Sequence, residues 1–235
     1  MLVIKERYLE TEEIRNNLAT RHEVLVGIII DKYIHKGDRF IVGENTDLNL
    51  PDVFNENKNI GYEVVWVERQ DEYLHSDVTR QLSKIKYDYD KYLQMKEQGD
   101  SVFNSIKLDI TTSDGIIVTT SAGAVFESAE NWMRQEYRSE LEKKFQKLNK
   151  GLYSDCTNIS LAVLTINSDF PGLNEKVLYG EYVKLCKQYR QKFDTIYLIS
   201  MDNIFCITET KIQKIKNYSS KEYEICVVEM RKRLA

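Results

Sequence analysis

The sequence predicts an α/β protein in which helices flank a mixed central sheet. Apolar residues recur at helical spacing in three long segments, at about residues 76–96, 128–149 and 179–192. Short runs rich in β-branched residues alternate with these segments. Strands that alternate with helices of this length are typical of a sheet covered by helices.

The N-terminal part is expected to contain one helix and then a buried strand. Ile14 and Leu18 have helical spacing, and Thr11 can cap a helix over about residues 11–21. Residues 24–30 form a short, continuous apolar run rich in β-branched side chains. Such a run is typical of a strand that is buried on both faces.

Further strands are expected where short apolar runs lie between turn-forming residues. The clearest run covers residues 61–67, and the polar residues 55–59 before it can form a hairpin turn. Residues 203–207 are expected to pair with the run before them as a hairpin. The expected strands are 39–42, 51–55, 61–67, 116–118, 159–166, 194–199 and 203–207.

Length and composition restrict the class of protein. A chain of 235 residues forms one large domain or two small ones, and no Gly/Ser-rich linker or internal repeat divides it. The longest apolar stretch is far shorter than the ~20 residues needed to cross a bilayer, so no membrane span is expected. Because charged residues follow soon after Met1, no signal peptide is expected. With a net charge of −4, contact with a polyanion would have to be local.

The cysteine and histidine positions indicate a reduced, cytoplasmic protein. The four cysteines are widely spaced and form no Cys-x-x-Cys motif, and the three histidines show no metal-binding spacing. Structural zinc and a disulfide framework are therefore not expected.

The segment 61–67 contains the most informative polar side chain. Side chains alternate across a strand, so Glu63 shares a face with Val65 and Val67. Burying a carboxylate costs several kcal/mol unless it is paired, protonated or bound to a cation. Asp52 begins the preceding short strand, and a tight hairpin would bring the two carboxylates together. Hard oxygen ligands of this kind favour Mg²⁺ or Mn²⁺. Alternatively, Asp52 is a turn residue and Glu63 an edge-strand carboxylate that faces water.

The same residues resemble the signature of a nuclease superfamily. Pro51-Asp52, followed by Ile60-Gly61-Tyr62-Glu63-Val64, is similar to the PD-(D/E)xK motif and to the "PDF … IGIEV" pattern of an uncharacterised prokaryotic branch. The resemblance implies a restriction-endonuclease-like core over roughly residues 10–200, within a single domain 1–235 that has a helical insertion near 71–115. It implies a metal-dependent endo- or exonuclease that hydrolyses DNA. Asp52, Glu63 and the Val64 carbonyl oxygen would hold the metal.

One position departs from the family pattern. The family lysine belongs two residues after the glutamate, where this chain has Val65. Some members supply the amine from the following helix, and Lys144 lies on or beside the apolar stripe of the helix expected at 128–149. Lys147 is one turn further along. Lys144 would therefore be catalytic, or it would only extend its charged end to solvent.

Two further acids and one further function stay open. In this superfamily a glutamate of the N-terminal helix sometimes approaches the metal, which makes Glu10 and Glu13 candidates. Alternatively, both complement the helix dipole. Val65 also favours a second function, an inactive nuclease-like fold that serves as a binding or assembly module. The sequence leaves the choice between DNA and RNA, and the existence of a homo-oligomer, undecided.

Overall fold

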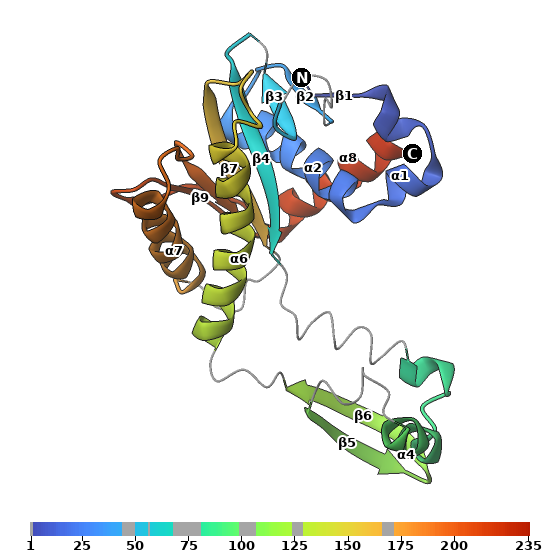
Figure 1. Cartoon of the computed structure of the whole chain (residues 1–235). Helices are drawn as coiled ribbons and strands as arrows, with labels where there is room; N and C mark the ends of the chain where they lie inside the picture. The colour runs from blue at the N-terminus through green and yellow to red at the C-terminus, as the bar shows by residue number, and fades with distance from the viewer. Residues whose placement is uncertain are drawn as a thin grey trace. The chain divides into compact units, whose positions relative to one another are not determined.

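The computed structural model describes residues 2–43, 50–55, 57–67, 81–98, 107–123, 129–165 and 172–235. The chain divides into two compact units, one formed by Met1–Val67 with Met133–Ala235 and the other by Glu68–Trp132. The first unit contains a mixed sheet flanked by helices (Figure 1). The predicted α/β class is therefore confirmed.

The main sheet has eight strands among the described residues, and it combines parallel and antiparallel neighbours. The pairs β1–β2, β4–β7 and β7–β8 are parallel, and the other neighbours are antiparallel. The predicted hairpin between β8 and β9 is present. In spatial order the strands are β1 Leu2–Ile4, β2 Phe40–Val42, β3 Val53–Asn55, β4 Ile60–Val67, β7 Asn158–Thr165, β8 Ile196–Ile199, β9 Asn203–Ile207 and β10 Ile212–Asn217.

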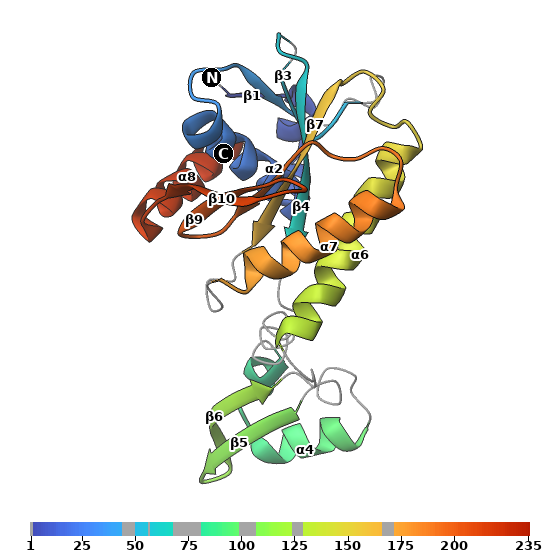
Figure 2. The same cartoon turned by 90° about the vertical axis from the view of Figure 1, so that its left-hand side faces the viewer.

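Helices cover both faces of this sheet. Figure 2 shows α2 and α8 on one side of β4 and β7, with α6 and α7 on the other. Thr11 caps α1 as predicted, since its side chain accepts a hydrogen bond from the backbone N–H of Ile14. The helices that lie wholly or mostly in the first unit are a 3₁₀ helix Glu6–Leu9, α1 Glu12–Asn16, α2 Leu18–Ile29 with a π-helical continuation Ile30–Ile34, α6 Ala129–Asn149, α7 Asn174–Gln188 and α8 Ser220–Leu234.

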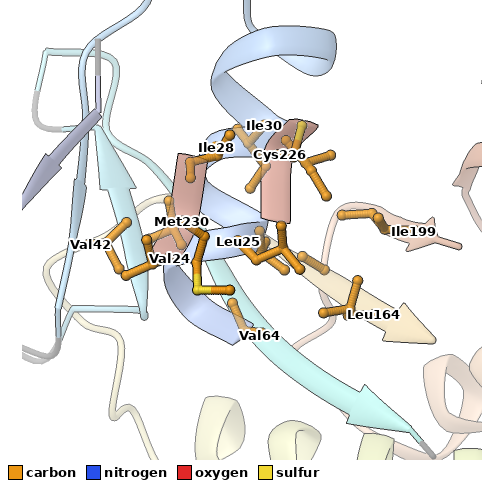
Figure 3. Packing of buried hydrophobic residues seen from close by; sticks show 14 of the residues in the cluster. Val24, Leu25, Ile28, Ile30, Val42, Val64, Leu164, Ile199, Cys226 and Met230 are labelled. Carbon is orange, nitrogen blue, oxygen red and sulfur yellow. The ribbon is translucent and has the colours of Figure 1, made fainter. Parts of the chain in front are cut away.

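The predicted strand at residues 24–30 is wrong, because this segment belongs to α2 and the start of its continuation. The helix lies between the sheet and α8, and its apolar side chains contact both (Figure 3). Val24 and Ile29 are fully buried. A helix buried on all sides has no polar face, so its sequence shows no helical period and cannot be distinguished from a buried strand.

The second unit contains strands as well as helix. Helix α4 spans Tyr89–Glu97, and β5 Lys107–Ser113 pairs with β6 Ile116–Gly123 in an antiparallel hairpin. The insertion expected to be helical near 71–115 therefore includes β-structure. The helix expected at 76–96 is interrupted, because Lys86 and Tyr87 have positive φ angles of 56° and 58°. Residues 76–80 lie outside the described part.

The packing of the β3–β4 hairpin requires a glycine at position 61. Gly61 lies opposite Phe54, and a Cβ atom at Gly61 would lie 2.1 Å from Pro51 Cγ and 2.9 Å from Cys156 Sγ. Contacts this short require Pro51 to move, and Asp52 with it. The close packing of Gly61 therefore fixes where the Asp52 carboxylate lies.

We expect Gly61→Ala to destabilise the protein by about 3 kcal/mol, the upper part of the usual range for overpacking. Chemical denaturation measures the effect. Gly180→Ala in α7 is the matched control, because a Cβ there meets no atom within 4 Å. Alanine in a helix is more favourable than glycine by roughly 0.5–1 kcal/mol, so this variant should be slightly stabilised. Equal effects of the two substitutions would contradict the packing argument.

Candidate functional site

The site lies at an edge of β4 that no strand of the described residues covers, referred to below as the open edge. Strand β3 begins at Val53, opposite Tyr62, so beyond Tyr62 the ladder between β3 and β4 ends. At this point the Asp52 side chain supplies the hydrogen-bond acceptor that a neighbouring strand would otherwise provide. Its Oδ2 accepts a hydrogen bond from the Val64 N–H at 2.8 Å. The N–H and C=O of one strand residue point in the same direction. The Val64 carbonyl is therefore also directed towards this edge.

A pocket of about 440 Å³ opens at this edge. Acidic, basic and aromatic side chains meet in it. They come from α2, the β3–β4 hairpin and α6, elements that are distant in the sequence. The lining residues are Tyr8, Leu18, Ala19, His22, Glu23, Asp52, Val64, Val65, Trp66, Glu140, Lys144 and Lys147.

Glu63 does not line the pocket itself, but it forms an ion pair with Lys144, which does. The Lys144 Nζ lies 2.6 Å from Glu63 Oε1, although the two residues are 81 positions apart. Lys147 Nζ lies 3.4 Å from the same oxygen. The exposed fraction is 3% for the Glu63 side chain and 17% for that of Lys144. The charged end of Lys144 is therefore paired with a carboxylate and does not simply extend to solvent.

The lysine remains charged in this environment. Burial acts to lower the pKa of Lys144, but the carboxylates of Glu63 and Asp52 and the hydrogen bond to Glu63 outweigh it, so the pKa lies above its ordinary value. At neutral pH the side chain is therefore an ammonium group. It can stabilise negative charge and orient a water molecule, but it has no free electron pair to accept a proton.

The pKa of Asp52 is also raised, which for an acid favours the neutral form. Burial, together with repulsion from Glu63 and Glu23, raises its pKa well above the usual carboxyl range, and Lys144 and the Val64 N–H only partly oppose this. The group therefore keeps its proton to higher pH than an ordinary aspartate. A cation at this position would offset the repulsion and favour the ionised form.

Glu23 is the acidic residue that the sequence interpretation missed. It lies on α2, lines the pocket, and accepts a hydrogen bond from the Tyr8 hydroxyl. With residues 24–30 interpreted as a strand, Glu23 fell in a loop. Glu23 lies in the middle of α2, directly before its buried apolar residues, so only the assignment of residues 18–29 as a helix would have identified it. By contrast, the predicted Glu10 and Glu13 are both exposed and do not line the pocket.

One wall of the pocket is aromatic. The His22 and Trp66 rings are stacked, with centroids 3.7 Å apart and planes 13° apart. Burial lowers the pKa of His22 to about 4, so the imidazole is neutral at physiological pH. Val65, at the position of the family lysine, also lines the pocket. The positive charge of the site therefore comes from Lys144 and Lys147 of α6.

The oxygen donors at this edge fit a hard divalent cation. Among the described residues, no hydrogen-bond donor contacts Asp52 Oδ1 or Glu63 Oε2. These atoms and the Val64 carbonyl are hard oxygen donors, a type that Mg²⁺ and Mn²⁺ prefer and zinc does not. In the same part of the chain, no group of three or more His, Cys, Asp or Glu side chains is arranged to hold a metal ion.

Comparisons of the chain with protein-family models, with curated proteins and with solved structures find no match. Within the described ranges, no helix is both long and apolar enough to cross a bilayer.

Proposed function

We propose that this chain is a metal-dependent nuclease of the PD-(D/E)xK type, which hydrolyses phosphodiester bonds of DNA with Mg²⁺ or Mn²⁺. The observation that carries the proposal is the convergence of Asp52, Glu63 and Lys144 at the open edge of β4. These are the carboxylates of the motif and an amine that replaces the lysine missing at position 65.

Each residue has a role that follows from its surroundings. Asp52 and Glu63, with the Val64 carbonyl, would hold the cation, and Glu23 adds negative charge beside them. The bound cation would polarise a phosphoryl oxygen and lower the pKa of a bound water. The Lys144 ammonium, held by Glu63, orients the attacking water and offsets negative charge that develops on the phosphate. Lys147, half exposed at the same pocket, attracts the phosphate from solution.

The proposal is tested with plasmid DNA, single-stranded DNA and RNA in Mg²⁺ or Mn²⁺. We expect cleavage by the unaltered protein and loss of cleavage in Glu63→Gln. Glu181→Gln is the matched control, because Glu181 is equally buried and ion-paired, with Arg134 and Lys184, but lies on α7 outside the pocket. Cleavage that persists in both Glu63→Gln and Asp52→Asn would exclude the proposed site.

The alternative, a binding or assembly module, predicts different results. Val65 in place of the family lysine favours it. Such a protein would cleave no nucleic acid. Addition of Mg²⁺ would hardly change its melting temperature, because only a ligand that binds the native state stabilises it.

Metal affinity should depend on pH through Asp52. Because the raised pKa of Asp52 lets the group hold its proton to higher pH than an ordinary aspartate, a cation that binds below that pKa must displace the proton. We expect the apparent affinity for Mn²⁺ to increase with pH, by up to about tenfold per pH unit while Asp52 is protonated. Calorimetry in mildly acidic to mildly basic buffers measures this, and Asp52→Asn should abolish the dependence. An affinity that does not vary with pH would show that Asp52 is no ligand.

A further inference from the structure

A second pocket, of about 290 Å³, lies where the corner between α1 and α2 meets the C-terminal end of α8. Figure 1 shows this end of α8 beside α1. Arg15, Arg21 and Arg231 line the pocket, and Glu12 is the only acidic side chain among its lining residues. Among its lining side chains, the pocket thus has three guanidinium groups and one carboxylate.

Arg15 and Arg21 are held in place by hydrogen bonds to neutral groups, so neither is neutralised. The Nη1 of Arg15 donates to the Leu9 carbonyl at 2.8 Å. Arg21 donates from Nε to the Arg15 carbonyl and from Nη2 to the Asn16 side chain. Arg231 is exposed. In the described part of the chain, none of the three forms an ion pair with a carboxylate. Their positive charge is therefore available to an anion.

We propose that this arginine pocket binds a phosphate group of the polynucleotide backbone, away from the scissile bond. The forked guanidinium matches phosphate geometry and binds it through paired hydrogen bonds. Because the whole chain has a net charge of −4, attraction of a polyanion requires such a local concentration of positive charge. The inference rests on the proposed nuclease function, since it assigns the substrate a second point of contact.

The position of the pocket supports a backbone contact. Helix α2 borders both pockets. The pocket that contains Asp52, here called the carboxylate pocket, is lined by Leu18, Ala19, His22 and Glu23 of this helix, whereas Arg21 lines the arginine pocket. The two pockets therefore lie around one short stretch of α2, on different sides of it. A helix with its side chains is about 10–12 Å across, so one polynucleotide strand can reach both pockets, but a single phosphodiester cannot.

The test measures binding apart from cleavage. A fluorescently labelled, single-stranded oligodeoxynucleotide is titrated with Glu63→Gln protein, and anisotropy gives the Kd at several salt concentrations. We expect Arg21→Ala and Arg231→Ala each to raise the Kd about tenfold and to reduce the slope of log Kd against log salt by about 0.7. Arg231→Ala is the cleaner variant, because no hydrogen bond of the fold is lost. Arg190→Ala, at an exposed arginine outside both pockets, should change neither quantity.

A kinetic arm separates this inference from the nuclease proposal. With Glu63 intact, Arg231→Ala should raise the KM for the oligonucleotide about tenfold and leave the hydrolysis of bis(p-nitrophenyl) phosphate unchanged. If the arginine substitutions do not change cleavage, the proposed role of the arginine pocket is wrong and the nuclease proposal stands. If binding depends on the arginines but the unaltered protein cleaves no DNA, the arginine pocket stands as a phosphate site and the nuclease proposal is wrong. Inorganic phosphate that binds at the arginines without competing with the oligonucleotide also overturns the assignment.

Discussion

Asp52→Asn should abolish metal-dependent cleavage and, at the same time, raise the melting temperature of the metal-free protein at neutral pH. The loss of cleavage follows because an amide is a poor ligand for a hard cation. The gain in stability follows because burial and the neighbouring carboxylates Glu63 and Glu23 disfavour the charged form of Asp52. Asparagine keeps an oxygen that can accept the hydrogen bond from Val64 and carries no charge.

The stabilisation should depend on pH in one direction. The pKa of Asp52 is higher in the folded protein than in the unfolded chain. Its contribution to stability is therefore complete below the unfolded pKa and is lost as the pH rises through the folded pKa. The difference in Tm between Asp52→Asn and the unaltered protein should be small in acid and increase towards neutral pH. In a chain of this size, about 1 kcal/mol shifts the Tm by about 2–4 °C.

Asp194→Asn is the matched control for this experiment. Burial also raises the pKa of Asp194, and its carboxylate also accepts a hydrogen bond from a strand amide, that of Ile159. Asp194 lies in a different pocket, so its substitution should leave cleavage unchanged. An Asp52→Asn protein that cleaves DNA, or that is less stable than the unaltered protein when metal-free, would contradict the proposed electrostatics.

The sequence predicts those helices and strands in which buried residues recur at regular helical or strand spacing. The strand 61–67 and the helix ending at residue 149 occur close to their expected bounds. The segment 24–30 was misinterpreted because α8, absent from the prediction, covers the side of α2 that faces away from the sheet. A strand such as β10, rich in lysine and only partly buried, lacks the apolar alternation that identifies a strand from sequence.

The same distinction applies to the site. Asp52 and Glu63 could be predicted to lie together because a short hairpin determines their register. Lys144 could be proposed from its position beside an apolar stripe, but its contact with Glu63 depends on how α6 packs against β4. Glu23 required the correct assignment of α2. No local pattern relates Arg231 to Arg21, because only the tertiary structure brings α8 to the corner between α1 and α2.

Lys144→Met is expected to eliminate cleavage and to destabilise the protein by about 3 kcal/mol, the lower end of the range for breaking a buried ion pair. The loss of cleavage follows because the charge that orients the attacking water disappears. The destabilisation follows because Glu63, whose side chain is 3% exposed, would keep only the half-exposed Lys147 at 3.4 Å. Urea denaturation measures the free energy of unfolding.

A double variant separates the two effects. Glu63→Gln combined with Lys144→Met removes both charges, so most of the lost stability should return while the protein stays inactive. Lys184→Met is the matched control, because Lys184 pairs with the equally buried Glu181 at 2.7 Å but is 53% exposed, and Glu181 retains Arg134. Such an exposed pair contributes at most about 1 kcal/mol. If Lys144→Met costs no more than Lys184→Met, or if it cleaves DNA normally, then Lys144 neither neutralises Glu63 nor takes part in the reaction.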